Sequence, residues 1–232
     1  ARIGYLSPNL ATSPHLREAF RQGLRDLGYV EGRNVVIEYR DAEGKGVERF
    51  PALAAELVAL KVDVIFVGGG TRVVLAAMQA TKTIPIVFAS VADPVGSGLV
   101  TSLARPGGNV TGLSGLTSEL VGKCLEQLKQ AVPGVSRVAV LWQPGGLGER
   151  TDKEVLKEAE AAAQALGVRL QFVEARGPED FDKAFSEIAR ARAGALTVLP
   201  GSMFVNERRR LVDLAAKTRL PAVYPWREVE AG

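Results

Sequence analysis

The stretch Asp63–Arg72 reads DVIFVGGGTR and holds the parts of one strand–turn–helix unit. The residues Val62–Val67 form an apolar run of the kind found in parallel strands that are buried on both faces. Three glycines then permit a tight turn, and the segment Val73–Ala80 has helical spacing. This order predicts an α/β fold that is built on parallel strands.

Strand-like and helical segments alternate over the rest of the chain. The expected strands are Ile3–Leu6, Val35–Tyr39, Val62–Val67, Ile84–Phe88, Val110–Leu113, Arg137–Leu141, Val168–Val173, Ala195–Leu199 and Ala222–Tyr224. The expected helices are Leu16–Leu27, Val47–Leu60, Val73–Ala80, Glu119–Gln130, Thr151–Leu166, Phe181–Ala191 and Glu207–Lys217. The spacing of Thr151 and Glu154 is that of a capping box, which predicts a helix start there.

The two halves of the sequence echo each other. LGYVEGRNVVIEYR at Leu27–Arg40 parallels LGVRLQFVEAR at Leu166–Arg176, and IPIVF at Ile84–Phe88 parallels LPAVY at Leu220–Tyr224. Between these segments, each half has an apolar strand that is followed by glycine and a hydroxyl residue. The repeat predicts two α/β domains of one topology, residues 1–114 and 115–232.

Glycine, hydroxyl and aromatic residues gather where the expected strands end. In open parallel sheets, ligands bind beyond the carboxyl ends of the strands. Two such sheets that face each other would form a cleft between the domains. The candidate ligand-binding residues are therefore Ser7, Pro8, Gly69, Gly70, Thr71, Ser90, Asp93, Trp142, Gly201, Ser202 and Trp226.

Each part of this candidate site also has a purely structural explanation. The glycine turn suits an acid group, because glycines admit a ligand to the backbone and a helix start favours an anion. The alternative is a turn that is capped by Thr71 and binds nothing. Asp93, which precedes a proline, can fix a turn or meet a ligand ammonium or hydroxyl. Trp142 and Trp226 can form an aromatic wall or pack at a domain edge.

Motifs for nucleotide binding and catalysis are missing. The glycines at 68–70 follow the third expected strand and have Val73 where a third small residue belongs, so they form no dinucleotide fingerprint. His15, the only histidine, is expected at a helix start on the surface, and Cys124 has the spacing of a core residue. No cluster of His, Cys or carboxylates stands at metal-ligand spacing. The sequence predicts a protein without catalytic activity, metal or cofactor.

Composition narrows the class of protein and its partners. Hydrophobic residues make up 47% of the chain and the net charge is only +3, which is unlike a nucleic-acid-binding protein. The densest basic cluster, Glu207–Arg210, is expected on a solvated helix face. No stretch is long enough to span a membrane. No signal peptide precedes the strand-like Ile3–Ser7, so the protein is either cytoplasmic or has lost a leader.

Several segments resemble one family. FRQGLRDLGYVEGRNVVIEYRDAEG at Phe20–Gly44, TIPIVFASVADPVGSGLVTSLARPGGNVTGLS at Thr83–Ser114, RAGALTVL at Arg192–Leu199 and LPAVYPWREVEAG at Leu220–Gly232 are similar to ABC transporter substrate-binding proteins of the tryptophan/tyrosine-binding type. The resemblance runs over essentially the whole chain. It implies a type I periplasmic-binding-protein fold, with two Rossmann-like lobes that trap a ligand by hinge closure.

The resemblance also implies a place and a set of partners. It suggests export behind a signal peptide or lipoprotein leader, and delivery of the ligand to a membrane permease; we expect a monomer. The residues that would contact the ligand are Ser7, Gly70, Thr71, Ser90 and Asp93 from the first lobe, and Trp142, Ser202 and Trp226 from the second.

Two departures from the family pattern stand out. Arg72 replaces the proline of the usual GGTPAA turn, which affects the predicted anion site. Family members also continue with a crossover strand, a helix and a tail, so the C-terminal part of the fold is expected to be missing from this sequence.

We therefore expect the extracytoplasmic solute-binding component of an ABC importer, which binds a small organic acid or an aromatic amino acid between its lobes. Two alternatives stay open. One is the ligand-sensing effector domain of a regulator or receptor, which has the same architecture. The other is an α/β enzyme, such as a racemase or isomerase, that works between the lobes and depends on Asp93 or Glu174.

Overall fold

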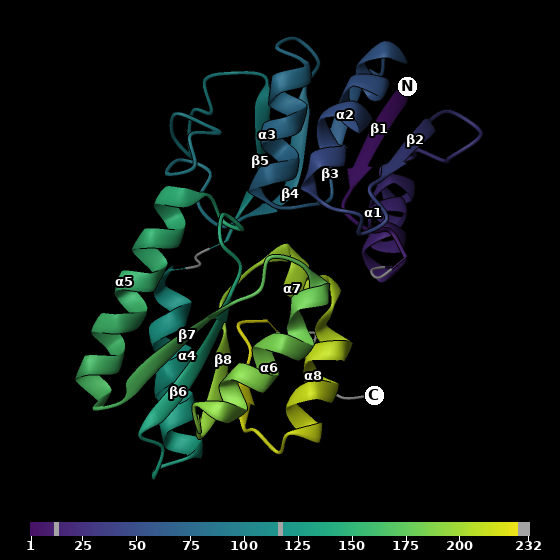
Figure 1. Ribbon diagram of the computed structural model, residues 1–232. Helices are drawn as coiled ribbons and strands as arrows, with labels where there is room; N and C mark the ends of the chain where they lie inside the picture. Colours follow the sequence, from purple (N-terminus) through teal and green to yellow (C-terminus); the bar gives the residue numbers. More distant parts are fainter. Residues whose placement is uncertain (12–13, 116–117, 227–232) are drawn as a thin grey trace. The chain divides into compact units, whose positions relative to one another are not determined.

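The structure is a computed structural model that describes residues 1–11, 14–115 and 118–226 (Figure 1). The chain divides into two compact units, Ala1–Gly115 and Leu116–Gly232. Each unit holds a sheet of parallel strands with helices packed against it. The predicted α/β fold with parallel sheets is therefore confirmed. That residues 1–114 and 115–232 fold as independent domains stays a prediction.

The first unit has a five-stranded sheet in the order β2-β1-β3-β4-β5. Its strands are β1 (Arg2–Ser7), β2 (Val36–Asp41), β3 (Val64–Val67), β4 (Ile86–Val91) and β5 (Val110–Ser114). Its helices are α1 (Pro14–Asp26), α2 (Phe50–Ala59) and α3 (Thr71–Ala80), with one short turn, η1 (Val47–Arg49), before α2. The chain passes from β1 to β2 and then returns to β3 on the other side, so β1 lies inside the sheet.

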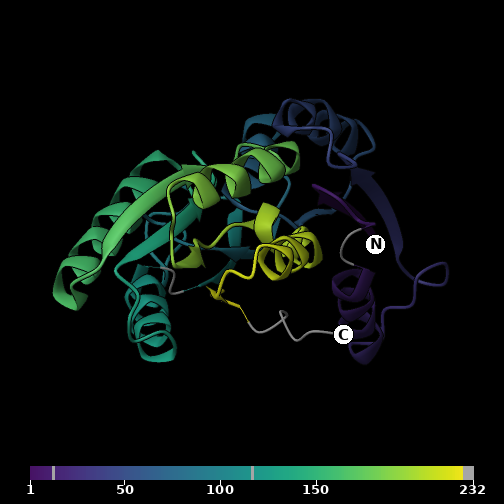
Figure 2. The ribbon, with the colours of Figure 1, turned by 60° about the horizontal axis from the view of Figure 1, so that its bottom comes forward.

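The two faces of this sheet are covered by different helices. Successive residues of a strand point to opposite faces, and Gly4 and Tyr5 show the result. A Cβ atom on Gly4 would stand 3.0 Å from each Cδ of Leu57 in α2. The ring of Tyr5 packs against Phe20 of α1, with the ring centroids 5.1 Å apart. Figure 2 shows α1 in purple on one side of the first sheet and α2 and α3 in blue on the other.

The α1 face of the first sheet is only partly covered. A groove of about 410 Å³ runs between α1 and the strands β1, β3, β4 and β5, and we call it the apolar groove. Its lining includes Leu16, Phe66, Val87 and Leu113. Leu113 is 71% exposed and Leu16 is 45% exposed. Helices normally cover both faces of a parallel sheet and bury its apolar side chains. The apolar groove is therefore unusual, because its side chains face solvent.

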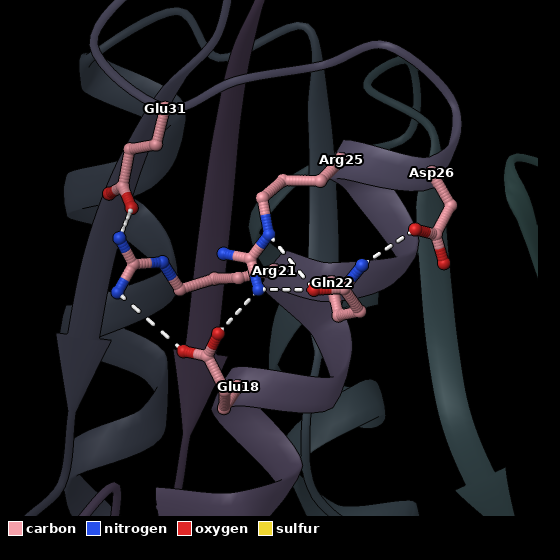
Figure 3. Close-up of polar contacts among 6 residues, drawn as sticks. All are labelled: Glu18, Arg21, Gln22, Arg25, Asp26 and Glu31. Carbon is pink, nitrogen blue, oxygen red and sulfur yellow. Dashed lines mark hydrogen bonds and ion pairs between the residues drawn. The ribbon is translucent and has the colours of Figure 1, made fainter.

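An ion-pair network joins α1 to the segment that leads into β2 (Figure 3). Arg21 pairs with Glu31 at 2.9 Å and lies 3.9 Å from Glu18. Arg25 donates hydrogen bonds to Glu18 at 2.5 Å and to Gln22 at 2.6 Å. The hydrogen bond from Arg25 lowers the pKa of the Glu18 carboxyl, and the charges of Arg25 and Arg21 act in the same direction. The polar side of α1 thus carries a network of ion pairs, while Phe20 on its other side packs against Tyr5 of the sheet.

The second unit has a four-stranded sheet in the order β7-β6-β8-β9. Its strands are β6 (Arg137–Trp142), β7 (Arg169–Glu174), β8 (Ala195–Val198) and β9 (Ala222–Val223). Its helices are α4 (Ser118–Ala131), α5 (Glu149–Leu166), α6 (Phe181–Arg190), α7 (Ser202–Asn206) and α8 (Arg208–Lys217), with one turn, η2 (Pro178–Asp180), before α6. One face buries Leu141 and Val198 with Phe181 and Phe204. The other buries Val138 with residues of α4 and α5.

The two units repeat the same topology, as the echo in the sequence predicts. In each, the first strand lies between the second and the third. The hydrogen bonds at the carboxyl end of this strand also correspond. The Ala42 N–H donates to the Ser7 carbonyl at 3.0 Å, and the Ala175 N–H donates to the Trp142 carbonyl at 2.9 Å.

Several expected helices start one to three residues from their predicted residue, as α5 and α8 show. The capping box at Thr151 is wrong, because α5 already begins at Glu149 and its N-cap is Gly148 with a φ of 98°. Thr151 lies inside the helix and is buried. The expected helix Glu207–Lys217 is shorter by one residue, since α8 starts at Arg208 after a separate short helix, α7. The predicted helix stop at Gly167 is confirmed, with a left-handed φ of 64°.

Candidate ligand-binding site

The predicted residues of the first unit come together at one edge of its sheet. The strands β1, β3 and β4 are parallel neighbours, so their carboxyl ends share an edge. Ser7 is the last residue of β1, Gly69 and Gly70 follow β3, and Ser90 belongs to β4. Ser7 is only 4% exposed. The topology therefore brings these residues together, and their contact with a ligand stays a prediction.

At Gly69 the loop after β1 comes close to the first turn of α3. A Cβ atom there would stand 3.1 Å from Cδ of Pro8 and 2.7 Å from a Cγ of Val73. A larger residue would push the loop after β1 away from α3. The space left by the missing side chain of Gly69 is thus partly filled by Pro8 and Val73 rather than by a ligand.

The start of α3 differs in detail from the expected turn. The helix begins at Thr71, and its N-cap is Gly70, so the alternative in which Thr71 caps the helix is wrong. The Gly70 carbonyl accepts a hydrogen bond from the Val73 N–H at 3.0 Å. Thr71 is 2% exposed, whereas Gly70 is half-buried. The backbone at Gly70, which lies at the positive end of the helix dipole, is therefore more accessible than the Thr71 side chain.

Asp93 fixes the turn that follows β4. Its Oδ1 accepts a hydrogen bond from the Gly96 N–H at 2.7 Å, and its carbonyl accepts one from the Ser97 N–H at 3.0 Å. This is the turn-forming role that an Asp before a proline commonly has. The structure shows this role, and a second role toward a ligand stays a prediction.

The predicted residues of the second unit also gather at the carboxyl edge of their sheet. Trp142 ends β6, Gly201 and Ser202 follow β8, and Trp226 follows β9. The sequence prediction missed Gln143. Its Oε1 lies 4.0 Å from the position of a Cβ on Gly201, and its Nε2 donates to the Arg176 carbonyl at 3.1 Å. Gln143 thus joins the loops after β6 and β7 and lies near Gly201, a role that no sequence pattern marks.

The two tryptophans have polar atoms without hydrogen bonds in the described part of the chain. Nε1 of Trp142, Nε1 of Trp226 and the hydroxyl of Tyr224 are all buried and lack a partner there. Trp226 and Tyr224 pack against the core of the second unit, with their ring centroids 5.7 Å apart. Burial raises the pKa of Tyr224 to about 12. Packing at the edge therefore describes Trp226, and a role of either indole in an aromatic wall stays a prediction.

His15, Cys124 and Arg209 lie as the sequence predicted, whereas Arg210 does not. His15 is exposed on α1, and Cys124 is buried, which raises the pKa of its thiol. No group of three His, Cys, Asp or Glu side chains that could hold a metal exists among the described residues. In the basic cluster Arg209 is exposed, but Arg210 pairs with Asp182 at 2.6 Å. Arg210 also lies over the Phe181 ring, so this part of the predicted solvated face covers the core instead.

Two units of one topology, each with a parallel sheet, have the architecture of the type I periplasmic-binding-protein fold. A match to a family model gives a closer classification of the chain. The chain belongs to the ABC transporter substrate binding protein family, whose model matches residues 13–228.

Individual relatives agree with this placement. A tyrosine-binding protein of Clostridioides difficile is 33% identical over 142 residues, which cover 61% of this chain and 40% of that protein. A crystal structure of a conserved domain protein from Vibrio cholerae has a TM-score of 0.84 and 28% identity, covering 97% of this chain and 73% of that one. An ABC domain in complex with L-Trp from Streptococcus pneumonia has a TM-score of 0.82 at 22% identity, with the same coverage.

Family membership indicates the kind of protein, and the coverage shows how much of a relative the chain matches. Membership in a family of substrate-binding proteins confirms the prediction of a binding protein rather than an enzyme. The match spans well under half the length of the curated relative, at 40%. Among residues 1–11, 14–115 and 118–226, no helix combines the length and apolar character needed to cross a membrane.

Proposed function

We propose that this chain works as the solute-binding component of an ABC importer and binds an amino acid or a small organic acid with an aromatic or apolar body. The observation that carries the proposal is membership in the substrate-binding family together with 33% identity to a tyrosine-binding protein. Substrate-binding proteins of ABC transporters are extracytoplasmic, and we place this one there with a membrane permease as its partner. A lipid anchor and a monomeric state stay predictions.

The acid group of the ligand would bind at the turn between β3 and α3. Backbone N–H groups and the dipole at a helix N-terminus favour an anion. Gly69 and Gly70 carry no side chain that would block the backbone, and Gly70 is half-buried. Thr71 is 2% exposed, so its hydroxyl offers little surface to a ligand. We therefore assign the main contact to the backbone at Gly70.

The remaining contacts would come from both units. In the first, Ser7 and Pro8 at the end of β1 and Ser90 and Asp93 at the end of β4 would contact the amine or hydroxyl of a ligand. In the second, the ligand-binding residues of this proposal are Trp142, Gly201, Ser202 and Trp226. The buried indole N–H groups of the two tryptophans lack acceptors in the described chain, which suits donation to a bound solute.

Hinge closure is the proposed mechanism. A ligand that contacts both units stabilises the arrangement in which the contacts are made together. The shift in population is only as large as the difference between its affinities for the closed and open forms. The permease would then recognise the closed form.

Isothermal titration with a solute panel tests the proposal. We expect saturable heat with L-tyrosine, L-tryptophan or an aromatic acid such as benzoate, and none with the corresponding amines that lack a carboxylate. Circular dichroism shows whether the sample is folded. No heat with any acid-bearing solute, from the full-length folded gene product, would overturn the proposal.

Two substitutions separate the roles of Asp93. Asp93→Asn keeps an oxygen for the Gly96 N–H but removes the charge, whereas Asp93→Ala removes both. If Asp93 meets a ligand ammonium, Asp93→Asn weakens amino-acid binding without lowering stability, and it leaves benzoate binding unchanged. Equal affinity of wild type and Asp93→Asn for every solute would confine Asp93 to its turn.

A further inference from the structure

A carboxylate fixes the first strand-to-helix loop of each unit. These loops are Pro8–Leu10 after β1 and Gln143–Gly148 after β6. Both directly follow a residue of the candidate site, Ser7 in one unit and Trp142 in the other. The conformation of each loop therefore decides how its unit presents that part of the site.

In the second unit the fixing carboxylate is Asp152. It lies in the first turns of α5 and is 7% exposed. Its two oxygens accept hydrogen bonds from backbone N–H groups of the loop, Oδ2 from Gly145 and Oδ1 from Leu147 at 3.2 Å. Gly145 and Gly148 have φ values of 71° and 98°, a conformation that few residues other than glycine adopt. Because glycine restricts the backbone least, the contacts with Asp152 reduce the number of conformations that this loop can adopt.

In the first unit the fixing carboxylate is Asp41, at the end of β2. Its Oδ2 accepts a hydrogen bond from the Leu10 N–H at 3.0 Å, and its Oδ1 accepts one from the Glu43 N–H at 2.9 Å. The Pro8 carbonyl accepts a further bond from the Gly44 N–H at 2.9 Å. The two units thus fix the same loop from different places: the strand β2 in one and the helix α5 in the other.

We propose that Asp41 and Asp152 are positioning residues that hold the two loops in one conformation before a ligand arrives, and that ligand affinity depends on them although neither touches the ligand. Hydrogen bonds from backbone N–H groups to a carboxylate are charge-assisted and stronger than neutral ones. A loop that is already ordered loses less conformational freedom on binding. The part of this inference that concerns affinity rests on the proposed binding function.

The test compares Asp41→Asn and Asp152→Asn with two controls on α5. Glu154→Gln removes a charge from an exposed side chain that pairs with Arg150 at 3.1 Å. Val155→Ala truncates a side chain that is 0% exposed and lies outside the loop in sequence, and it should lower stability. All variants are studied where circular dichroism shows them fully folded. Hydrogen exchange reports on the Leu10 and Leu147 amides, and calorimetry reports the Kd for L-tyrosine.

Each Asn variant should accelerate exchange of the amide in its own loop and raise the Kd on the order of tenfold, which corresponds to about 1.4 kcal/mol. Neither control should change the loop exchange or the Kd. Unchanged exchange in the Asn variants would overturn the inference whether or not a ligand binds. Faster exchange with an unchanged Kd would overturn the dependence of affinity on the two carboxylates. A wild type that binds none of the acid-bearing solutes of the panel would count against the proposed function, while the exchange data still decide the role of the carboxylates in the loops.

Discussion

Leu57 of α2 fills the space that a side chain at Gly4 of β1 would need. Both Cδ atoms of Leu57 lie 3.0 Å from the Cβ position of Gly4. Gly4→Ala should therefore overpack this contact and lower the free energy of unfolding by about 1–3 kcal/mol. Urea unfolding, followed by circular dichroism, measures the difference.

Gly23 offers the matched control for this substitution. It lies within α1, and a Cβ atom there would meet nothing within 4 Å. Gly23→Ala should raise the free energy of unfolding by about 0.5–1 kcal/mol, because alanine restricts the unfolded chain more than glycine does. Equal effects of the two substitutions would contradict the packing of Leu57 on β1.

The Glu18 carboxyl should titrate below its ordinary range because Arg25 donates a hydrogen bond to it (Figure 3). Arg25→Gln should return the pKa of Glu18 toward its usual value, as measured by nuclear magnetic resonance. A group with a lowered folded-state pKa stabilises the protein above its unfolded pKa, and this contribution is lost as the pH falls through the folded pKa. The stability difference between wild type and variant should therefore shrink on acidification.

Glu43 is the control for that titration. Its pKa is also lowered, but by a hydrogen bond from Lys45. Arg25→Gln should leave the titration of Glu43 unchanged. A shift of both carboxyls would point to a general change of charge rather than to the contact drawn in Figure 3.

Tyr224 should make the protein less stable in alkali. Burial raises its pKa to about 12 from 10.0, so the folded state keeps the phenol proton to higher pH than the unfolded chain does. Stability therefore falls as the pH rises through that window. Tyr224→Phe should remove this part of the pH dependence in chemical unfolding. It should be neutral or slightly stabilising at neutral pH, because the hydroxyl is buried without a partner in the described chain.

The apolar groove should bind hydrophobic probes. Leu113→Lys places a charge on its open wall and should reduce both the fluorescence of an apolar dye and any self-association of the 232-residue chain. Leu103→Lys is the matched control, since Leu103 is 67% exposed but does not line the groove. Equal effects of the two substitutions on dye binding would argue against the groove as the binding surface.

The sequence predicted the sheets well because buried parallel strands are marked by their own composition. Val62–Val67 and Arg137–Leu141 are apolar almost throughout, and the glycine at 167 marks a helix end. The start of α5 could not be predicted in the same way. The capping-box spacing at Thr151 is a local signal, and the buried contacts of Asp152 with the preceding loop outweigh it.

The candidate site was predictable as a set of strand ends but not in its contacts. Parallel topology alone brings Ser7, Gly70 and Ser90 to one edge. The near-complete burial of Thr71 has no signal in the local sequence, and Gln143 bonds a residue 33 positions away in the chain. Polar residues such as Gln143 and Asp152 carry no periodic signal, so only the folded backbone identifies what they join.

The inner position of β1 also gives the first unit a mechanical property. This strand is hydrogen-bonded to β2 along one side and to β3 along the other. A force applied at Ala1 along the strand would load both ladders in shear, and neither could unzip one bond at a time. The two-residue strand β9 pairs only with β8 in the described chain. Under a pulling force, the short ladder of β9 should therefore separate long before β1 slides free of its two neighbours.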